Sequence, residues 1–404
     1  MKAINFTKII IALVGISFFL PFVYLSRYVY LFSDDMSRAG YPVSSLLDRY
    51  FFWVKNENGR YINALLTNFS VYDLKIQRFV PILFLVFFLL AIFYFLKSLE
   101  IRNGLRTPKL YLVTAALVVG SQVISKLPVV AHFLYWFAAS TVYLLSLVAL
   151  LLLSSNFIRK RFFGKYLLIN CSLIIFCCGS NEMSAAIIGV LLIGIFTNQI
   201  FKQKVSTKKI LLIYGGVYTL SIIPLIFLSG AQSRINYYED QSNLLDALYR
   251  ATYSTLAVSF DNIFDWHNIF LAFFFMCLFL NGYRKKISIS RKKLRTYISN
   301  VVISFGCFWV SFFVLYYAVG RAAFNLDRTG NFLNVVFLIV LVFNLYSLNV
   351  FIEAREKTDV NYRYFFGVLA IILMIFNYSS TNYQTAVNDI LSGKAANFST
   401  EMKK

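Results

Sequence analysis

Acidic residues are scarce in this chain of 404 residues, which has 18 aspartates and glutamates against 39 lysines and arginines. Charged residues of either sign make up only 14% of the sequence, whereas hydrophobic residues make up 59%. Disordered chains and ordinary soluble chains carry more charge and fewer apolar residues, so both classes are excluded. The few carboxylates are therefore the first side chains to consider for a function.

The sequence also lacks the usual signatures of metal, disulfide and nucleotide sites. Its two histidines, His132 and His267, are far apart, and no Gly-rich phosphate loop, H-E-x-x-H or G-x-S-x-G motif is present. A divalent cation such as Mg²⁺ or Mn²⁺, held by carboxylates, stays open as a cofactor. The five cysteines lie inside apolar runs without C-x-x-C spacing, which is typical of small core residues: Cys171, Cys177, Cys178, Cys277 and Cys307.

Long apolar runs are what the sequence has in abundance. A helix needs roughly 20 apolar residues to cross the hydrocarbon layer, so the runs predict an all-α integral membrane protein with about eleven transmembrane helices. The shorter runs also fit half-helices or re-entrant segments. No small-residue cleavage pattern follows the first run, which favours a retained span over a signal peptide. The runs occupy about 9–30, 79–96, 110–124, 133–153, 166–178, 183–200, 210–229, 267–282, 298–319, 332–350 and 364–378.

Basic residues gather in alternate connections between these runs. Short connections rich in lysine and arginine stay on the cytoplasmic side, so this pattern predicts that the N-terminus is inside and that a short tail, 379–404, is outside. The whole of 1–378 then forms one polytopic domain. The basic connections would face anionic lipid headgroups, so the net charge of +21 does not indicate a nucleic-acid partner. They lie at about 97–109, 159–165, 202–209, 284–295 and 355–363.

Two adjacent carboxylates, Asp34 and Asp35, begin an outer loop that covers about 31–78. Paired carboxylates suit a general base or a cation held near a phosphate; the alternative is that they cap a helix or stay solvated. Apolar residues at helical spacing over about 42–56, with Ser44 and Ser45 as caps, predict an amphipathic helix at the membrane surface. The sequence Gly-Arg-Tyr follows at 59–61, before the second span.

Two other outer segments place charge beside apolar runs. The turn at 179–184 contains Glu182, and a glutamate at membrane depth marks a functional site by default, the alternative being a solvated turn. Arg321 and Arg328 lie on the side that otherwise lacks basic loops. Arginine grips phosphate through its planar fork, so these two are candidate phosphate contacts, the alternative being pairing with Asp327 or lipid headgroups.

The second long outer loop, about 230–266, mixes aromatic rings with hydrogen-bonding side chains. Sugars are bound by such mixtures, because their apolar faces stack on rings while their hydroxyl groups meet polar atoms. The alternative is ordinary solvated loop polarity. Function is therefore sought on the outer side, in this loop and the segments above.

The order of a first span, Asp-Asp at its outer end, an amphipathic helix with aromatic residues and then Gly-Arg before the second span resembles the polytopic GT-C-type glycosyltransferases. It is more closely similar to bacterial membrane proteins grouped with the O-antigen glucosyltransferases. The resemblance implies a GT-C-like helix arrangement in the bacterial cytoplasmic membrane, a sugar donor on a polyprenyl phosphate, and a catalytic acid at Asp35 or Asp34. With the segments above, the substrate-binding candidates are Arg60, Tyr61, Asn181, Glu182, Arg321 and Arg328.

The expected function is sugar transfer from that carrier to a cell-envelope glycan or a lipid-linked acceptor on the outer face. One alternative is a transporter or flippase, which keeps ionisable residues near the midplane of broken helices, often in two related halves. Here most charges lie at the outer edge and the halves show no evident similarity. The other alternative is a non-catalytic polysaccharide-assembly protein, which would tolerate the loss of Asp34 and Asp35.

Overall fold

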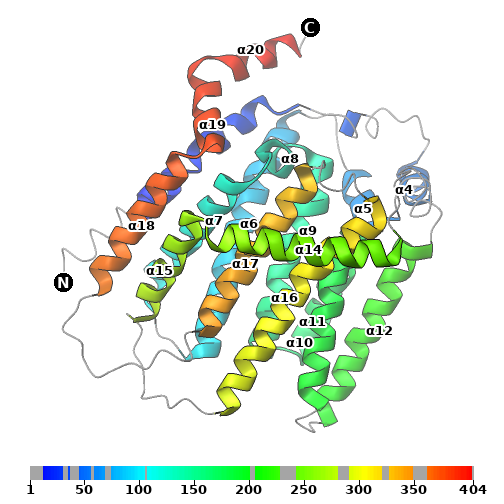
Figure 1. Ribbon diagram of the computed structural model, residues 1–404. Helices are drawn as coiled ribbons and strands as arrows, with labels where there is room; N and C mark the ends of the chain where they lie inside the picture. Colours follow the sequence, from blue (N-terminus) through cyan, green and yellow to red (C-terminus); the bar gives the residue numbers. More distant parts are fainter. Residues whose placement is uncertain are drawn as a thin grey trace.

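The computed structural model describes residues 12–30, 35–36, 45–55, 59–68, 74–104, 107–200, 205–227, 243–280, 291–320, 327–348 and 362–402. All regular secondary structure in these residues is helical, and none of them forms a β-strand. Most of the helices run side by side in one bundle, while α14 lies across the others (Figure 1). The all-α fold class is confirmed.

The helices follow the apolar runs closely. The first apolar helix is Ala12–Tyr28, which contains α2 (Leu20–Leu25) and a final 3-10 turn, Ser26–Tyr28. The others are α4 (Leu46–Trp53), α5 (Tyr61–Asn68), α6 (Leu74–Asn103), α7 (Lys109–Lys126), α8 (Val130–Leu134), α9 (Phe137–Ile158), α10 (Lys165–Ser180), α11 (Glu182–Ile200), α12 (Val205–Phe227), α14 (Leu244–Ile263), α15 (Trp266–Leu280), α16 (Arg291–Val319), α17 (Asp327–Leu348), α18 (Tyr362–Tyr378), α19 (Thr381–Leu391) and α20 (Lys394–Glu401).

Five of the described helices are long and apolar enough to cross a membrane, and seven spans result if each of two bent pairs is one crossing. Each of the eleven predicted runs contains a helix, but several are short. The 16 residues of α10, for example, are about 24 Å long, less than the roughly 30 Å of the hydrocarbon layer. The chain is therefore a multi-pass membrane protein with five to seven candidate spans among its described residues.

Apolar residues cover both the inside and the outside of the bundle. Inside, phenylalanine rings interlock between helices, as where Phe274 of α15 stacks on Phe366 of α18 with ring centres 4.6 Å apart. Outside, large side chains such as Leu212 and Leu220 of α12 are mostly exposed. A soluble protein would cover this surface, whereas lipid tails solvate it without cost.

The two ends of the bundle differ, and contacts between distant helices define each end. At one end, Arg102 of α6 donates to the side chain of Asn300 in α16 at 3.2 Å, close to the basic connections. At the other end, Asn331 of α17 binds the backbone of Val129 through both its oxygen and its nitrogen. We call these the basic end and the outer end.

The first outer loop contains the predicted amphipathic helix. Ser45 caps α4, because its side-chain oxygen accepts a hydrogen bond from the amide of Asp48 at 3.1 Å. Leu46, Leu47 and Phe51 are exposed on its surface. An exposed apolar face on a short capped helix fits a position at the membrane surface, as the spacing predicted.

The described part of the second outer loop is an unexpected helix. Asn243 caps α14, whose 20 residues lie across the bundle (Figure 1). Small residues line its buried face, including Ala247 and Ala251, so the helix approaches α16 closely. Its other face exposes a stripe of large residues: Leu245, Tyr249, Tyr253, Leu256 and Phe260. The part of the predicted long loop at 230–242 lies outside the described residues.

The C-terminal tail also folds, as α19 and α20 at the outer end (Figure 1). Asn382 of α19 donates to the carbonyl oxygens of Ile124 and Leu127, at 2.9 and 2.7 Å, and so satisfies the last turn of α7. Tyr30 donates its hydroxyl to the carbonyl of Ser399 at 2.8 Å. The tail is therefore fixed to the ends of the first apolar helix and α7.

The orientation is testable with exposed positions at both ends. In a protein whose five native cysteines are replaced by alanine, Ser45→Cys and Lys394→Cys should react with a membrane-impermeant maleimide in intact cells. Lys165→Cys and Lys209→Cys should react only after permeabilisation, because the positive-inside rule places the basic end in the cytoplasm. The reverse pattern would place Asp35 on the cytoplasmic side and exclude a reaction on the outer face.

Candidate functional site

The candidate site forms where α5 inserts into the outer end of the bundle. Gly59 has a φ of 66°, which turns the chain into α5 immediately before Arg60. Asn63, Ala64 and Thr67 of α5 are buried, and the helix packs against α9 and α10. The sequence Gly-Arg-Tyr is therefore part of the packed interior and not of a surface loop.

A close approach of α5 to α10 depends on Gly179. A Cβ atom at this position would lie 2.5 Å from side-chain atoms of both Tyr61 and Ile62, closer than real atoms approach. The hydroxyl of Tyr61 donates to the carbonyl oxygens of Ile175 and Ser221, at 3.2 and 3.3 Å. The predicted substrate contact Tyr61 is thus engaged in joining α5 to α10 and α12.

An ion pair joins the two sequence motifs that contain Arg60 and Glu182. The Nε of Arg60 donates to both carboxylate oxygens of Glu182, at 2.9 and 3.0 Å, and its Nη2 donates to Oε2 at 2.6 Å. The side chains are 8% and 28% exposed. This is the fork geometry that arginine forms with carboxylates. Any substrate anion at Arg60 must therefore share the guanidinium with Glu182 or displace it.

The N-terminal half of α9 connects this ion pair to the outer surface. Thr141 donates its hydroxyl to the side-chain oxygen of Asn63 in α5 at 2.7 Å. Tyr143, in the same half of α9, lies close enough to Arg60 to influence its guanidinium. Since the helix rises about 1.5 Å per residue, Tyr143 lies about 7.5 Å along α9 from Ala138. Groups bound to these two positions are therefore neighbours along one helix.

Asp35 lies at the start of α9. Its Oδ1 accepts a hydrogen bond from the amide of Ala138, the second residue of the helix, at 2.9 Å, and the residue is 1% exposed. The positive end of the helix dipole favours a negative charge at this place. The structure thus fixes the Asp35 carboxylate within about two turns of α9 from Arg60 and Glu182. Asp34, its neighbour in sequence, lies outside the described residues.

Aromatic and basic side chains complete this end of α9. The guanidinium of Arg328 lies over the ring of Trp136, 5.4 Å from its centre, and the ring of His132 lies 5.2 Å from that of Trp136. We call Asp35, His132, Trp136 and Arg328 the α9 cluster. Sequence reasoning predicted Asp35 and Arg328 separately, and the structure brings both to the first turn of α9. The other predicted arginine, Arg321, lies outside the described residues.

His132 is a member that sequence reasoning missed. Burial lowers its pKa and Arg328 adds to this effect, while Asp327 opposes it. The imidazole is therefore neutral at neutral pH, and its buried Nδ1 has no hydrogen-bond partner among the described residues. A neutral imidazole beside an arginine can accept a proton. The signal in the sequence was a histidine in a short outer connection, four positions before a tryptophan.

Asn181 occupies the turn between α10 and α11. Its side-chain oxygen accepts a hydrogen bond from the amide of Met183 at 2.9 Å, which caps α11. Its Nδ2 is buried without a hydrogen-bond partner among the described residues. Asn181 is thus both a cap and, next to Glu182, a donor that a bound hydroxyl group would satisfy.

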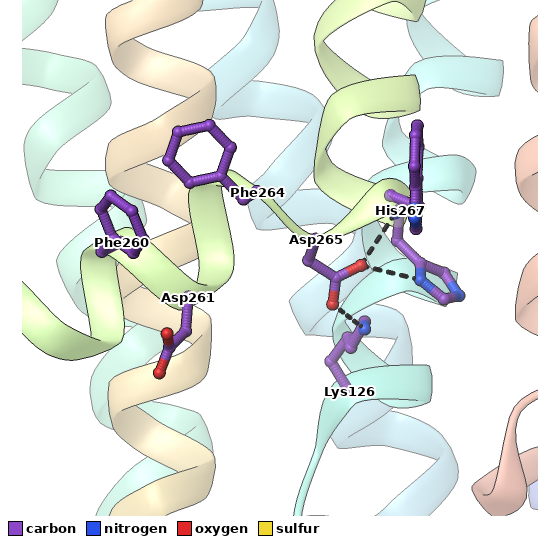
Figure 2. Close-up of a pocket in the computed structure, with 7 residues that line it drawn as sticks. Lys126, Phe260, Asp261, Phe264, Asp265 and His267 are labelled. Atoms are coloured by element: carbon purple, nitrogen blue, oxygen red, sulfur yellow. Dashed lines mark hydrogen bonds and ion pairs between the residues drawn. The ribbon is translucent and has the colours of Figure 1, made fainter.

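A shallow open depression of about 510 Å³ lies near the bend between α14 and α15 (Figure 2). In it, the carboxylate of Asp265 pairs with Lys126 and accepts hydrogen bonds from the amide and the Nδ1 of His267, at 2.8 and 2.9 Å. Burial would raise the pKa of Asp265, but these partners hold it below its usual range. The depression is lined by Lys126, Phe260, Asp261, Phe264, Asp265, Trp266 and His267.

In the described part of the chain, no three side chains of the metal-binding types gather into one group. Asp35 would therefore need ligands from elsewhere to hold Mg²⁺ or Mn²⁺, and its sequence neighbour Asp34 is not described.

No protein-family profile, curated protein or solved structure matches this chain. The geometry of the outer end and the sequence motifs are therefore what indicate its function.

The role of the Arg60–Glu182 pair can be tested through stability. Glu182→Gln leaves a buried guanidinium without its countercharge, so the free energy of unfolding should fall by about 3 kcal/mol, and the melting temperature in detergent should fall with it. The matched control is Asp246→Asn, which breaks the more exposed pair with Arg250 and should lower the melting temperature much less. Equal shifts for the two variants would show that the ion pair does not hold α5 in place.

Proposed function

We propose that this protein is a membrane glycosyltransferase that takes a sugar from a polyprenyl-phosphate carrier at the outer surface and transfers it to a cell-envelope glycan or a lipid-linked acceptor. The observation that carries the proposal is the α9 cluster, in which a carboxylate, Asp35, is bound to the amide of Ala138 and an arginine, Arg328, lies over the ring of Trp136, both at the start of α9. The order of the sequence motifs, which resembles that of GT-C enzymes, also supports a glycosyltransferase.

The reaction is a displacement at the anomeric carbon. The acceptor hydroxyl oxygen forms a bond to this carbon and gives its proton to Asp35 as general base, while the bond from the carbon to the phosphate oxygen breaks. The leaving polyprenyl phosphate keeps the bonding electrons, so negative charge grows on it. Arg328 then stabilises this charge through its guanidinium donors.

Arg60, the arginine of the ion pair, has a structural part in this reaction, whereas Arg328 contacts the phosphate. Because Arg60 is bound by Glu182, its part is to hold α5 beside α9, and the sugar hydroxyl groups would meet Glu182 and Asn181. Arg328 is more available to phosphate, since its described contact is the face of Trp136. Asp35 is 1% exposed, so the side chains around it must separate when the acceptor enters.

The depression at the bend of α14 and α15 suits the acceptor. Phe260, Phe264 and Trp266 are exposed, and Asp261 also lines the depression, with its carboxylate pointing away from the rings of Phe260 and Phe264 (Figure 2). A sugar chain binds to a surface that offers aromatic faces together with hydrogen-bond acceptors. The depression and the α9 cluster both lie at the outer end, to which Lys126 and Asn331 belong.

Substituting the two aspartates separates catalysis from helix capping. Asparagine caps a helix about as well as aspartate, so Asp35→Asn keeps an oxygen for the Ala138 amide but cannot act as a base. In reconstituted vesicles with a labelled polyprenyl-phosphate sugar, this variant should lose about 10²- to 10⁴-fold in rate, and Asp34→Asn should lose less.

The control is Asp389→Asn, the same change in the outer helix α19, where the carboxylate lies 3.7 Å from the mostly exposed ammonium of Lys394. It should transfer sugar at the wild-type rate. Near-normal transfer by Asp35→Asn, Asp34→Asn and the double variant would reject the enzymatic reading. Transport or assembly functions would then be left as the alternatives.

A further inference from the structure

The connection between α9 and α10, at the basic end, carries four basic residues within seven positions: Arg159, Lys160, Arg161 and Lys165. We call it the basic turn. Its two arginines have no carboxylate partner among the described residues, where every ion pair lies elsewhere. The proposed transfer reaction at the outer end does not use this turn.

Both guanidinium groups are held in place by neutral side chains. Arg159 donates from Nε to the hydroxyl of Ser98 at 2.7 Å and lies over the ring of Tyr94, 4.3 Å from its centre. Arg161 donates from Nη1 to the hydroxyl of Tyr94 at 2.8 Å and lies over the ring of Tyr166 at 4.8 Å. Tyr94 therefore holds the two arginines next to each other although both are positive.

The backbone of the turn is fixed as well. Asn170 donates to the carbonyl oxygen of Arg161 at 2.8 Å, and the amide of Arg161 donates to the carbonyl of Asn156 at 2.9 Å. Lys160 has a φ of 57°, a left-handed conformation that glycine adopts more easily at a helix end. A lysine at this position adds positive charge at a conformational cost, which indicates that the charge has a use.

Most of the donors of these two arginines have no acceptor among the described residues. Each guanidinium has five N–H groups, and the bonds above occupy one on each. The Nη2 of Arg159 is buried and has no hydrogen-bond partner among the described residues, which is costly for a charged group. Burial lowers the pKa of Arg159, and Arg161 lowers it further. Two adjacent guanidinium groups without a carboxylate partner in the described part of the chain suit an anion with several acceptor oxygens.

The surroundings of the turn indicate a lipid as the source of that anion. Phe163, Leu168 and Ile169 are exposed beside the basic residues, on the surface that lipid tails cover. Basic pockets between transmembrane helices on the cytoplasmic side bind phosphate-bearing lipid headgroups. We propose that the basic turn binds the phosphate group of an anionic lipid, whose oxygens accept hydrogen bonds from Arg159 and Arg161 while its chains lie along α10.

The test measures binding of phosphatidylglycerol to the full-length protein by native mass spectrometry, after exchange from phosphatidylcholine micelles. The variant Arg159→Gln/Arg161→Gln should bind this lipid about tenfold more weakly, since it loses charged hydrogen bonds. The control Lys109→Gln/Lys209→Gln removes the same charge from exposed lysines near the basic end and should change affinity less than about twofold. Equal loss in both variants would reduce the effect to net charge and overturn the proposal.

Two further measurements test whether the phosphate comes from a lipid, and keep the proposal testable if the double arginine variant does not fold. Competition by millimolar inorganic phosphate or glycerol phosphate would overturn the lipid as the ligand, and its absence supports the lipid. Photoactivatable phosphatidylglycerol in vesicles should label the wild-type segment 159–169 preferentially. Labelling spread evenly over the membrane surface would overturn the proposal even where the double arginine variant does not fold.

Discussion

The pairing of Arg60 with Glu182 organises the outer end of this protein. It brings a segment of the first outer loop into the bundle and attaches it to the turn between α10 and α11, 122 positions away in sequence. Because α5 then contacts α9 through Asn63 and Thr141, the ion pair also holds α5 beside the helix whose first turn binds Asp35. A buried pair of this kind is costly to break, so it fixes one arrangement of these segments.

Charge is distributed very unevenly along the bundle. Carboxylates with defined partners, such as Asp35, Glu182 and Asp265, lie toward the outer end, while the basic turn at the opposite end has arginines without carboxylate partners in the described residues. The membrane favours this division, since positive charge is kept at the cytoplasmic surface and an ionised group in the hydrocarbon layer is expensive. Each end thus has the side chains for a different ligand chemistry.

The sequence predicted local features well and distant contacts poorly. Apolar runs predicted the helices, and Ser45 was a correct candidate cap for α4, because both signals are contained in a few neighbouring residues. The helix α14 was missed although its Asn243 cap and the small residues at helical spacing were visible; its aromatic residues were interpreted as a sugar-binding loop. The tail was likewise not predicted to be helical. Asn382 binds the backbone carbonyls at the end of α7, and the local sequence does not show this contact.

The candidate site shows the same limit. Arg60 and Glu182 were selected separately as substrate contacts, and nothing local could show that they bind each other. His132 was not selected because it lacked the spacing of a metal ligand. Its position beside Trp136 and Arg328 arises from tertiary packing. Asp35 was selected as a candidate catalytic acid, which stays a prediction, and its contact with the first turn of α9 depends on packing that the local sequence does not show.

A structure of the protein in lipid nanodiscs with a non-reactive polyprenyl-phosphonate sugar tests the central claim most directly. The account predicts that the phosphonate lies within hydrogen-bonding distance of Arg328, with the anomeric carbon facing Asp35 and the Arg60–Glu182 pair intact. A phosphonate bound away from the first turn of α9, with Asp35 still covered and in contact only with Ala138 and its other protein neighbours, would contradict it.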